Sequence, residues 1–196
     1  MPDKYGVQQD IYCYSGTSIL KNKFNIQSSE MLENAETEFT LVRAEEYKPS
    51  FTQFNLEHLK SIHFHLFQDI YDWAGELRQV DISKSESRFC TVSRIVHETI
   101  NLLTKLNNEN NLTELSRNDF VESSADFYCE LNVIHPFRDG NGRAQRIFFE
   151  ELAVNAGFEF AWSQVQRADW LNANIAGFNT NLVPLISLFN QIISPI

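Results

Sequence analysis

The chain has 196 residues, of which 43% are hydrophobic, and a formal net charge of −10. This size and apolar content suffice for one buried core, so we expect a single domain, residues 1–196. The negative net charge argues against direct nucleic-acid binding, which requires a basic face. No apolar stretch approaches the roughly 18 residues of a membrane span, so we expect no membrane partner. The three cysteines form no CxxC pair and predict neither a disulfide framework nor a zinc site, so we expect a cytoplasmic protein.

The first half of the chain predicts two amphipathic helices followed by a hairpin. Apolar residues recur at helical spacing over residues 27–46 and again over residues 54–74, after which Gly75 ends the helix. Within residues 80–92, apolar residues then flank a polar turn at residues 84–86, which is typical of a β-hairpin.

The second half of the chain predicts helices with readable ends. One helix is expected over about residues 95–106, and the next begins at Ser116, which forms a capping-box pattern with Asp119. This helix breaks before Pro136, because proline disfavours helical geometry in the residue before it. A further helix ends near Gly157, and a last one has Pro184 in its first turn. We therefore expect a mainly α fold, a helical bundle with one β-hairpin.

Residues 135–146 read HPFRDGNGRAQR and bring a base, a carboxylate, two glycines and three arginines together where a helix begins. His135 can accept the proton of an attacking hydroxyl near pH 7, so it is the candidate general base. Backbone N–H groups at a helix N-terminus bind anions, and Gly140 and Gly142 let phosphate oxygens approach them without a Cβ in the way. This catalytic loop therefore predicts an anion hole beside a base.

The charged side chains of the loop extend this prediction to a nucleotide and a metal ion. Arg143 and Arg146 lie three residues apart, hence on one helix face, where their planar groups can grip the outer phosphates. Asp139 supplies the hard oxygen ligand that Mg²⁺ requires when phosphates and waters fill its other positions. We expect Asp139 to be the only carboxylate in this site.

The loop matches every specified position of the motif HPFx(D/E)GNGRxxR, and in this the chain resembles the Fic family. The resemblance implies a Fic-type helical bundle that binds ATP and Mg²⁺, with His135 as the base and Asp139 as the magnesium residue. It also implies that Asn141 is a ligand of the α-phosphate and that Phe137 belongs to the nucleotide-binding residues.

The likeness extends upstream, because residues 59–78 resemble the helix that precedes the flap of this family. By position, the hairpin over residues 80–92 is that flap. The resemblance implies that the flap aligns the target protein by strand addition, in which main-chain hydrogen bonds form along an exposed edge. The flap residues expected to dock the target are Ile82, Ser83, Lys84 and Arg88.

The intact second glycine, Gly142, favours one reaction among those of the family. ATP then binds with its α-phosphate toward His135, a Ser, Thr or Tyr hydroxyl of the target protein attacks in line, and pyrophosphate leaves. Uridylyl or guanylyl transfer stays open, because the base pocket cannot be read from the sequence. Two further functions also stay open: a Doc-type phosphotransferase, which transfers the γ-phosphate, and a non-catalytic nucleotide-binding or scaffolding protein that keeps the anion loop but has lost turnover.

Restraint of the activity is a further expectation from the resemblance. Many members are held inactive by a helix with the pattern (S/T)xxxE(G/N), whose glutamate pairs with the arginine corresponding to Arg146. Residues 29–34 fit this pattern through Glu33, yet so short a pattern arises by chance in roughly one chain in ten. We therefore expect a separate small antitoxin with an inhibitory glutamate helix, so that the chain is the toxin of a toxin–antitoxin pair. Members of similar size imply type II topoisomerase subunits as targets.

Other polar residues predict no function. His58, His63 and His65 lack the spacing of a metal site, since residues two apart on a helix point to different faces, and we expect structural roles for them. Arg138 stands at a variable position of the motif, so we expect its side chain to be solvated.

Overall fold

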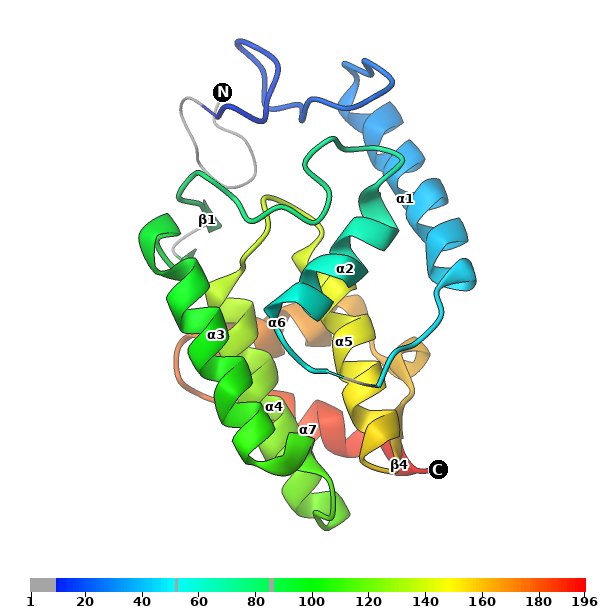
Figure 1. The fold of residues 1–196 in the computed structure, drawn as a ribbon, viewed down its shortest axis with the longest axis vertical. Coiled ribbons are helices and arrows are strands. Elements are labelled where there is room, and N and C mark those ends of the chain that lie inside the picture. The colour runs from blue at the N-terminus through cyan, green and yellow to red at the C-terminus, as the bar shows by residue number, and fades with distance from the viewer. Residues whose placement is uncertain (1–9, 52, 85–86) are drawn as a thin grey trace.

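The computed structural model describes residues 10–51, 53–84 and 87–196, which fold into a mainly helical bundle (Figure 1). Seven α-helices lie in this part of the chain: α1 (Ser29–Glu46), α2 (Leu56–Phe67), α3 (Val92–Asn108), α4 (Arg117–Ile134), α5 (Asn141–Asn155), α6 (Arg167–Phe178) and α7 (Val183–Ile192). Short 3₁₀ helices, η1 (Asn110–Leu112) and η2 (Trp162–Gln164), connect some of them. None of the helices in these residues is both long and apolar enough to cross a membrane. The predicted mainly α fold is confirmed.

Two small antiparallel sheets accompany the helices in the described residues. β1 (Ser83–Lys84) pairs with β2 (Ser87–Arg88), and this pair is the predicted hairpin. Its ladder is shorter than the predicted segment 80–92, and residues 85 and 86 at its turn lie outside the described residues. β3 (Phe158–Phe160) pairs with β4 (Ile193–Pro195) and forms a second sheet that the sequence patterns do not predict.

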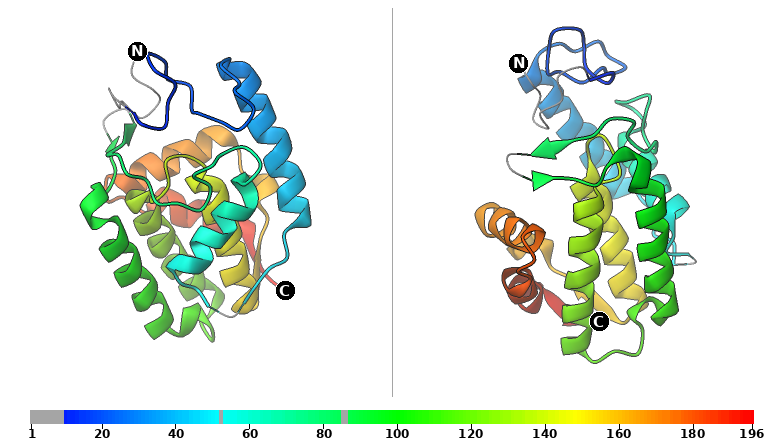
Figure 2. Two further views of the ribbon diagram at one scale, coloured as in Figure 1. Left: turned by 45° about the horizontal axis from the view of Figure 1, so that its top comes forward. Right: turned by 90° about the vertical axis from the view of Figure 1, so that its left-hand side faces the viewer.

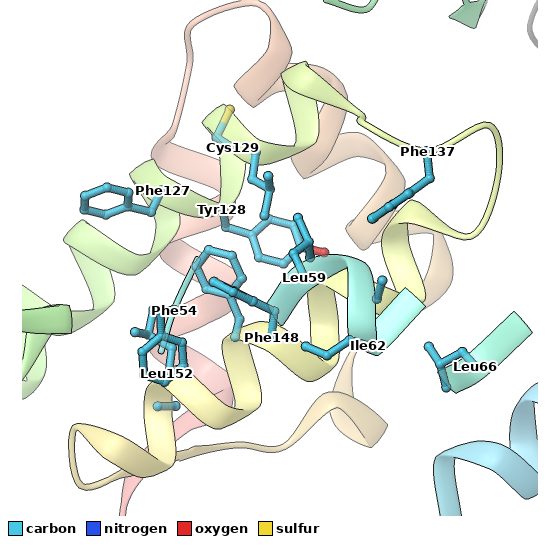
Figure 3. Packing of buried hydrophobic residues seen from close by; sticks show 14 of the residues in the cluster. Phe54, Leu59, Ile62, Leu66, Phe127, Tyr128, Cys129, Phe137, Phe148 and Leu152 are labelled. Atoms are coloured by element: carbon cyan, nitrogen blue, oxygen red, sulfur yellow. The ribbon is translucent and has the colours of Figure 1, made fainter. Parts of the chain in front are cut away.

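The helices α4 and α5 form the centre of the bundle. α3 packs against α4, α6 and α7 cover another side of α4, and α2 packs on α5 with α1 outside it (Figures 1 and 2). Figure 3 shows the core between these helices, where the rings of Phe54 and Phe148 meet edge to face with centroids 5.5 Å apart. This packing places the end of α4 beside the start of α5, and residues 135–140 join the two at one end of the bundle.

Local signals explain some of the helix ends. Ser116 Oγ accepts a hydrogen bond from the Asp119 N–H at 3.3 Å, so the predicted cap is confirmed. α2 ends at Phe67, earlier than the predicted residue 74, and turns then lead to Gly75, whose φ is +78°. The sequence does not predict α6, because this helix buries only small residues, Ala173 and Gly177, and therefore lacks an apolar stripe.

Candidate active site

His135 ends α4 in a left-handed backbone conformation, with φ 50° and ψ 63°. Its N–H donates to the Leu131 carbonyl at 3.1 Å, and its ring stacks on Phe89 with centroids 4.0 Å apart. His135 Nδ1 lies 3.2 Å from the Asn132 carbonyl oxygen. Because a carbonyl oxygen only accepts, this contact places the proton on Nδ1 and makes Nε2 the basic nitrogen. The half-buried imidazole is thus held in one orientation and one tautomer.

Asn141 holds the catalytic loop closed. Its side-chain oxygen accepts from the Phe137 N–H at 2.8 Å, and its amide group donates to the Phe137 carbonyl at 2.8 Å. Both residues are buried, and the Phe137 ring stacks on His63 with centroids 3.9 Å apart. The resemblance assigns both residues to nucleotide binding. These contacts are with the protein itself, and they shape the loop that presents its N–H groups.

His63 of α2 links the catalytic loop to the turn at Gly75. Its Nδ1 accepts from the Gly75 N–H at 2.9 Å, so its Nε2 carries the proton and donates to the Asp139 carbonyl at 2.9 Å. The ring is fully buried between Phe67 and Phe137. Burial lowers the pKa of His63 to about 4, although the hydrogen bond to Asp139 opposes this shift. The expected structural role of His63 fits these contacts, and the imidazole is neutral at physiological pH.

The neutral state of His63 predicts a pH-dependent stability. The unfolded chain binds a proton at His63 below an ordinary pKa of 6.5, whereas the folded chain does so only near pH 4. The contribution is therefore complete above pH 6.5 and is lost as the pH falls from 6.5 toward 4, by about 3 kcal/mol at most. Urea unfolding of the wild type and of His63→Gln between pH 7.5 and 4 tests this. Parallel pH profiles for the two proteins would contradict it.

The two glycines of the loop differ in their surroundings. Gly140 precedes α5 with φ +75°, and a Cβ there would lie 2.3 Å from Cζ of Phe67. At Gly142, in the first turn of α5, a Cβ would meet no atom within 4 Å. The first N–H groups of a helix have no partner within the helix, and the space over Gly142 leaves them accessible to an anion. Gly140 is therefore packed against α2, whereas Gly142 faces open space, and the anion-binding role of the two glycines stays a prediction.

A cavity of about 550 Å³ lies between α1, the segment before it and the catalytic loop. Asp139 and Arg143 line it from the loop side, whereas Glu33 and Glu36 line it from α1. The expectation that Asp139 is the only carboxylate in this site is therefore wrong. The sequence carries no signal for this, because α1 and the loop are about a hundred residues apart and meet only in the folded chain.

Arg143 makes an internal ion pair in this cavity. Its guanidinium donates to a Glu36 carboxylate oxygen and, at 3.2 Å, to Thr40 Oγ1, and it lies over the Phe67 ring with Cζ 4.5 Å from the centroid. The Tyr71 hydroxyl donates to the other Glu36 oxygen, and burial, with Glu36 beside it, raises the pKa of this phenol. The group predicted to bind phosphate is thus already paired with a carboxylate.

Arg146 contacts a different part of the protein. Its Cζ lies 5.8 Å from the ring centroid of Trp162 and 5.5 Å from that of Trp170, in η2 and α6. Arg143 instead extends toward α1, so the two arginines diverge although they are three residues apart. The spacing predicts that they share one face of α5, but their side chains contact separate neighbours, α1 for Arg143 and η2 and α6 for Arg146. Their phosphate-binding roles remain predictions.

Asp139 is suited to hold Mg²⁺ in its predicted role. The residue is only 7% exposed and lines the cavity, and its Oδ1 accepts from the Gly140 N–H at 2.7 Å. Among the described residues, no group of three or more His, Cys, Asp or Glu side chains is placed to hold a metal ion. One carboxylate next to a phosphate-binding loop fits Mg²⁺, which keeps several waters and takes its remaining ligands from the nucleotide.

The expectation that Arg138 is solvated is wrong. Its side chain is 1% exposed and pairs with Asp10, whose side chain is 2% exposed, with Nε donating to Oδ2 at 2.6 Å. The Asp10 carboxylate also accepts from the Tyr12 N–H at 2.9 Å, which ties the N-terminal segment to the loop. Although Arg138 stands at a variable position of the motif, it is buried because it pairs with Asp10, a residue 128 positions away in the sequence.

The predicted docking residues occupy two environments. Ile82 is buried and packs with Phe89 and Phe178, so it anchors the hairpin rather than presenting a side chain. Lys84 and Arg88 are exposed, and Arg88 lies 3.5 Å from an Asp81 carboxylate oxygen. Ser83 pairs with Arg88 in the β-ladder. The hairpin therefore offers polar groups outward from an apolar base, and the docking role stays a prediction.

Comparison with known proteins gives consistent matches. The model of the Fic/DOC family matches residues 53–153. A probable protein adenylyltransferase Fic of Escherichia coli strain K12 is 42% identical over 194 residues, covering 99% of this chain and 97% of the relative. The protein adenylyltransferase VbhT of Bartonella schoenbuchensis is 36% identical over 180 residues, covering 91% of this chain but 38% of the relative.

Solved structures show the same fold. The BepC protein of Bartonella tribocorum, with bound AMPPNP, superposes with a TM-score of 0.87 at 31% identity, covering 94% of this chain and 97% of that one. The N-terminal Fic domain of a cell filamentation protein of Bartonella quintana, with bound ADP, gives a TM-score of 0.87 at 30% identity, covering 94% of each chain. The predicted Fic-type helical bundle is confirmed.

Proposed function

Because the chain belongs to the Fic/DOC family, we propose that it is a protein adenylyltransferase, which transfers AMP from ATP to a Ser, Thr or Tyr hydroxyl of another protein. The observation that carries the proposal is the position of His135, whose basic Nε2 stands at the end of α4 beside the anion-accepting start of α5. The names of the relatives support the activity, and the AMPPNP and ADP bound to the structural neighbours support a nucleotide ligand.

The chemistry requires one proton acceptor and a site for the leaving group. His135 Nε2 takes the proton of the target hydroxyl as its oxygen attacks the α-phosphorus, and the bond from phosphorus to the bridging oxygen breaks. The leaving pyrophosphate is anionic, and the first N–H groups of α5 and Arg143 stabilise it. Mg²⁺, held by Asp139 when bound, supplies further neutralisation of the phosphates.

The proposal extends to the partners expected from the sequence. A separate small antitoxin with a glutamate helix restrains the enzyme, and type II topoisomerase subunits are its targets in the cytoplasm. The cavity between α1 and the loop supports a regulatory site, since Glu33 and Glu36 lie there with Arg143. Arg146, which the family pattern pairs with an inhibitory glutamate, instead lies against Trp162 and Trp170.

The test distinguishes transfer of the α-phosphate of ATP from transfer of its γ-phosphate. Purified protein is incubated with Mg²⁺ and either α- or γ-labelled ATP in a bacterial lysate, and the label in each protein band is quantified. Label from the α-position alone is expected, and its loss in His135→Ala would assign it to this site. Label from the γ-position would show phosphotransfer and overturn the proposal. Absence of label, also in Glu36→Gln where the internal pair with Arg143 is broken, would favour nucleotide binding without turnover.

A further inference from the structure

Arg78 is a buried arginine between α2 and the hairpin that the proposed mechanism does not use. Its side chain is completely buried, and the nearest carboxylate, Asp81, lies 4.0 Å away with half of its side chain exposed. Burying a charge is costly unless hydrogen bonds compensate for the lost water. An apolar residue of similar volume would fill this space at lower cost, so the contacts of the guanidinium explain its presence.

Within the described part of the chain, the hydrogen bonds of the Arg78 guanidinium go to backbone carbonyl groups on two separate segments. Nε donates to the His135 carbonyl at 2.8 Å, and Nη2 lies 3.3 Å from the Ile134 carbonyl oxygen. On the other side, Nη1 donates to the Val80 carbonyl at 2.8 Å, and Nη2 donates to the Cys90 carbonyl. One rigid planar group therefore joins the end of α4 to both ends of the hairpin.

Backbone contacts reinforce this junction. The Arg78 N–H donates to the Pro136 carbonyl at 3.0 Å, and the Cys90 N–H donates to the Val133 carbonyl at 3.1 Å. The ring of Phe89 stacks on the His135 imidazole. The two arms of the hairpin, residues 80–84 and 87–90, are thus tied to the residue that would act as the base.

We propose that Arg78 is a positioning residue for the transfer reaction, because its guanidinium fixes the two hairpin arms relative to His135. The inference rests on the proposed function, in which the hairpin holds the target segment while His135 takes its proton. A shift of the hairpin by about 1 Å then misplaces the target hydroxyl and costs up to about 100-fold in rate. The nucleotide, by contrast, is expected to contact residues 137–146, whereas the hydrogen bonds of Arg78 described above reach only His135 and Pro136 at the beginning of the loop.

The sharpest variant is Arg78→Lys, which keeps the charge but replaces the planar fork with a single ammonium group. Three donors on one nitrogen cannot serve all four carbonyls, so the junction loosens. Arg117→Lys is the matched control. The Arg117 guanidinium also donates to backbone carbonyls, those of Asn190 and Ile193, but at the start of α4, away from the loop.

Three measurements distinguish a positioning role of Arg78 in the transfer reaction from a general role in folding. Labelling of lysate proteins from α-labelled ATP is expected to fall about 10- to 100-fold in Arg78→Lys, while the affinity for AMPPNP with Mg²⁺ stays within twofold. Amide hydrogen exchange at Phe89 and Cys90 is expected to become faster, whereas exchange at Ala144 in α5 is unchanged. Arg117→Lys is expected to match the wild type in all three.

The outcomes are distinct. Unchanged labelling in a folded Arg78→Lys protein, or a loss of AMPPNP affinity as large as the loss of labelling, would overturn the proposal. If neither the wild type nor Glu36→Gln labels any protein, the proposed function fails, and exchange at Phe89 and Cys90 still decides whether Arg78 holds the hairpin. If Arg78→Lys does not fold, the same measurements are made on Arg78→Met, which fills the space without a buried charge.

Discussion

Replacing His135 with asparagine is expected to slow nucleotidyl transfer by about 100- to 10,000-fold, the range lost with a general base. Asparagine is chosen because it tolerates the left-handed conformation, which His135 adopts with φ 50°. His135→Ala should lose as much activity but also some stability, since a left-handed alanine costs about 1 kcal/mol or more. Initial rates of α-label transfer and urea unfolding curves measure both effects.

His97→Asn is the control for this comparison. His97 is exposed on α3 and contacts only Asn101 within its own helix among the contacts described, so its replacement should leave rate and stability unchanged. A His135→Asn protein that is folded and retains more than about a tenth of the wild-type rate would remove His135 from the role of base.

Gly140→Ala is expected to destabilise the protein by about 2–5 kcal/mol, from a strained left-handed backbone and an overpacked contact. The new Cβ would lie 2.3 Å from Cζ and 2.4 Å from Cε2 of Phe67, and 3.1 Å from His63 Nε2. Phe67 and His63 are fully buried, so neither ring has open space into which it can move. Thermal and urea unfolding would detect the loss, and activity should fall because the loop is displaced.

Gly142→Ala is the matched variant in the same loop. Its Cβ meets no atom within 4 Å, so the free energy of unfolding should stay equal or rise by up to about 1 kcal/mol, as for glycine to alanine in a helix. Its methyl group would nevertheless stand where phosphate oxygens approach, so AMPPNP binding should weaken. Equal stability losses in both variants, or unchanged AMPPNP affinity in Gly142→Ala, would contradict the division of roles between the two glycines.

The parts of the fold that sequence patterns predicted depend on neighbours close in the chain. The cap at Ser116 needs only Asp119, and the left-handed turn into α5 is marked by Gly140 itself, whose φ is +75°. The helix α6 escaped prediction because Ala173 and Gly177 give no apolar stripe. The sheet of β3 and β4 was not predicted, because it joins segments more than thirty residues apart through strands of only three residues.

The missing features of the site depend on distant partners. The pair of Glu36 with Arg143 joins residues 107 positions apart, and no pattern within α1 marks Glu36 among its other acidic residues. Arg78 stood within a recognisable segment, yet its partners are backbone carbonyls, which carry no residue identity. The residue types of the loop therefore predict a chemistry, whereas the contacts that orient the loop could not be predicted from the sequence.

With Arg143 in its proposed phosphate-binding role, its pair with Glu36 makes the nucleotide affinity depend on the fraction of molecules in which the pair is open. The arginine is available to a phosphate only in the fraction of molecules whose ion pair is open, and the apparent dissociation constant rises in inverse proportion to that fraction. A pair that is closed about 90% of the time weakens apparent binding about tenfold without altering any contact in the bound state. Any ligand or protein that stabilises either arrangement of Glu36 thereby adjusts the ATP concentration at which the enzyme becomes saturated.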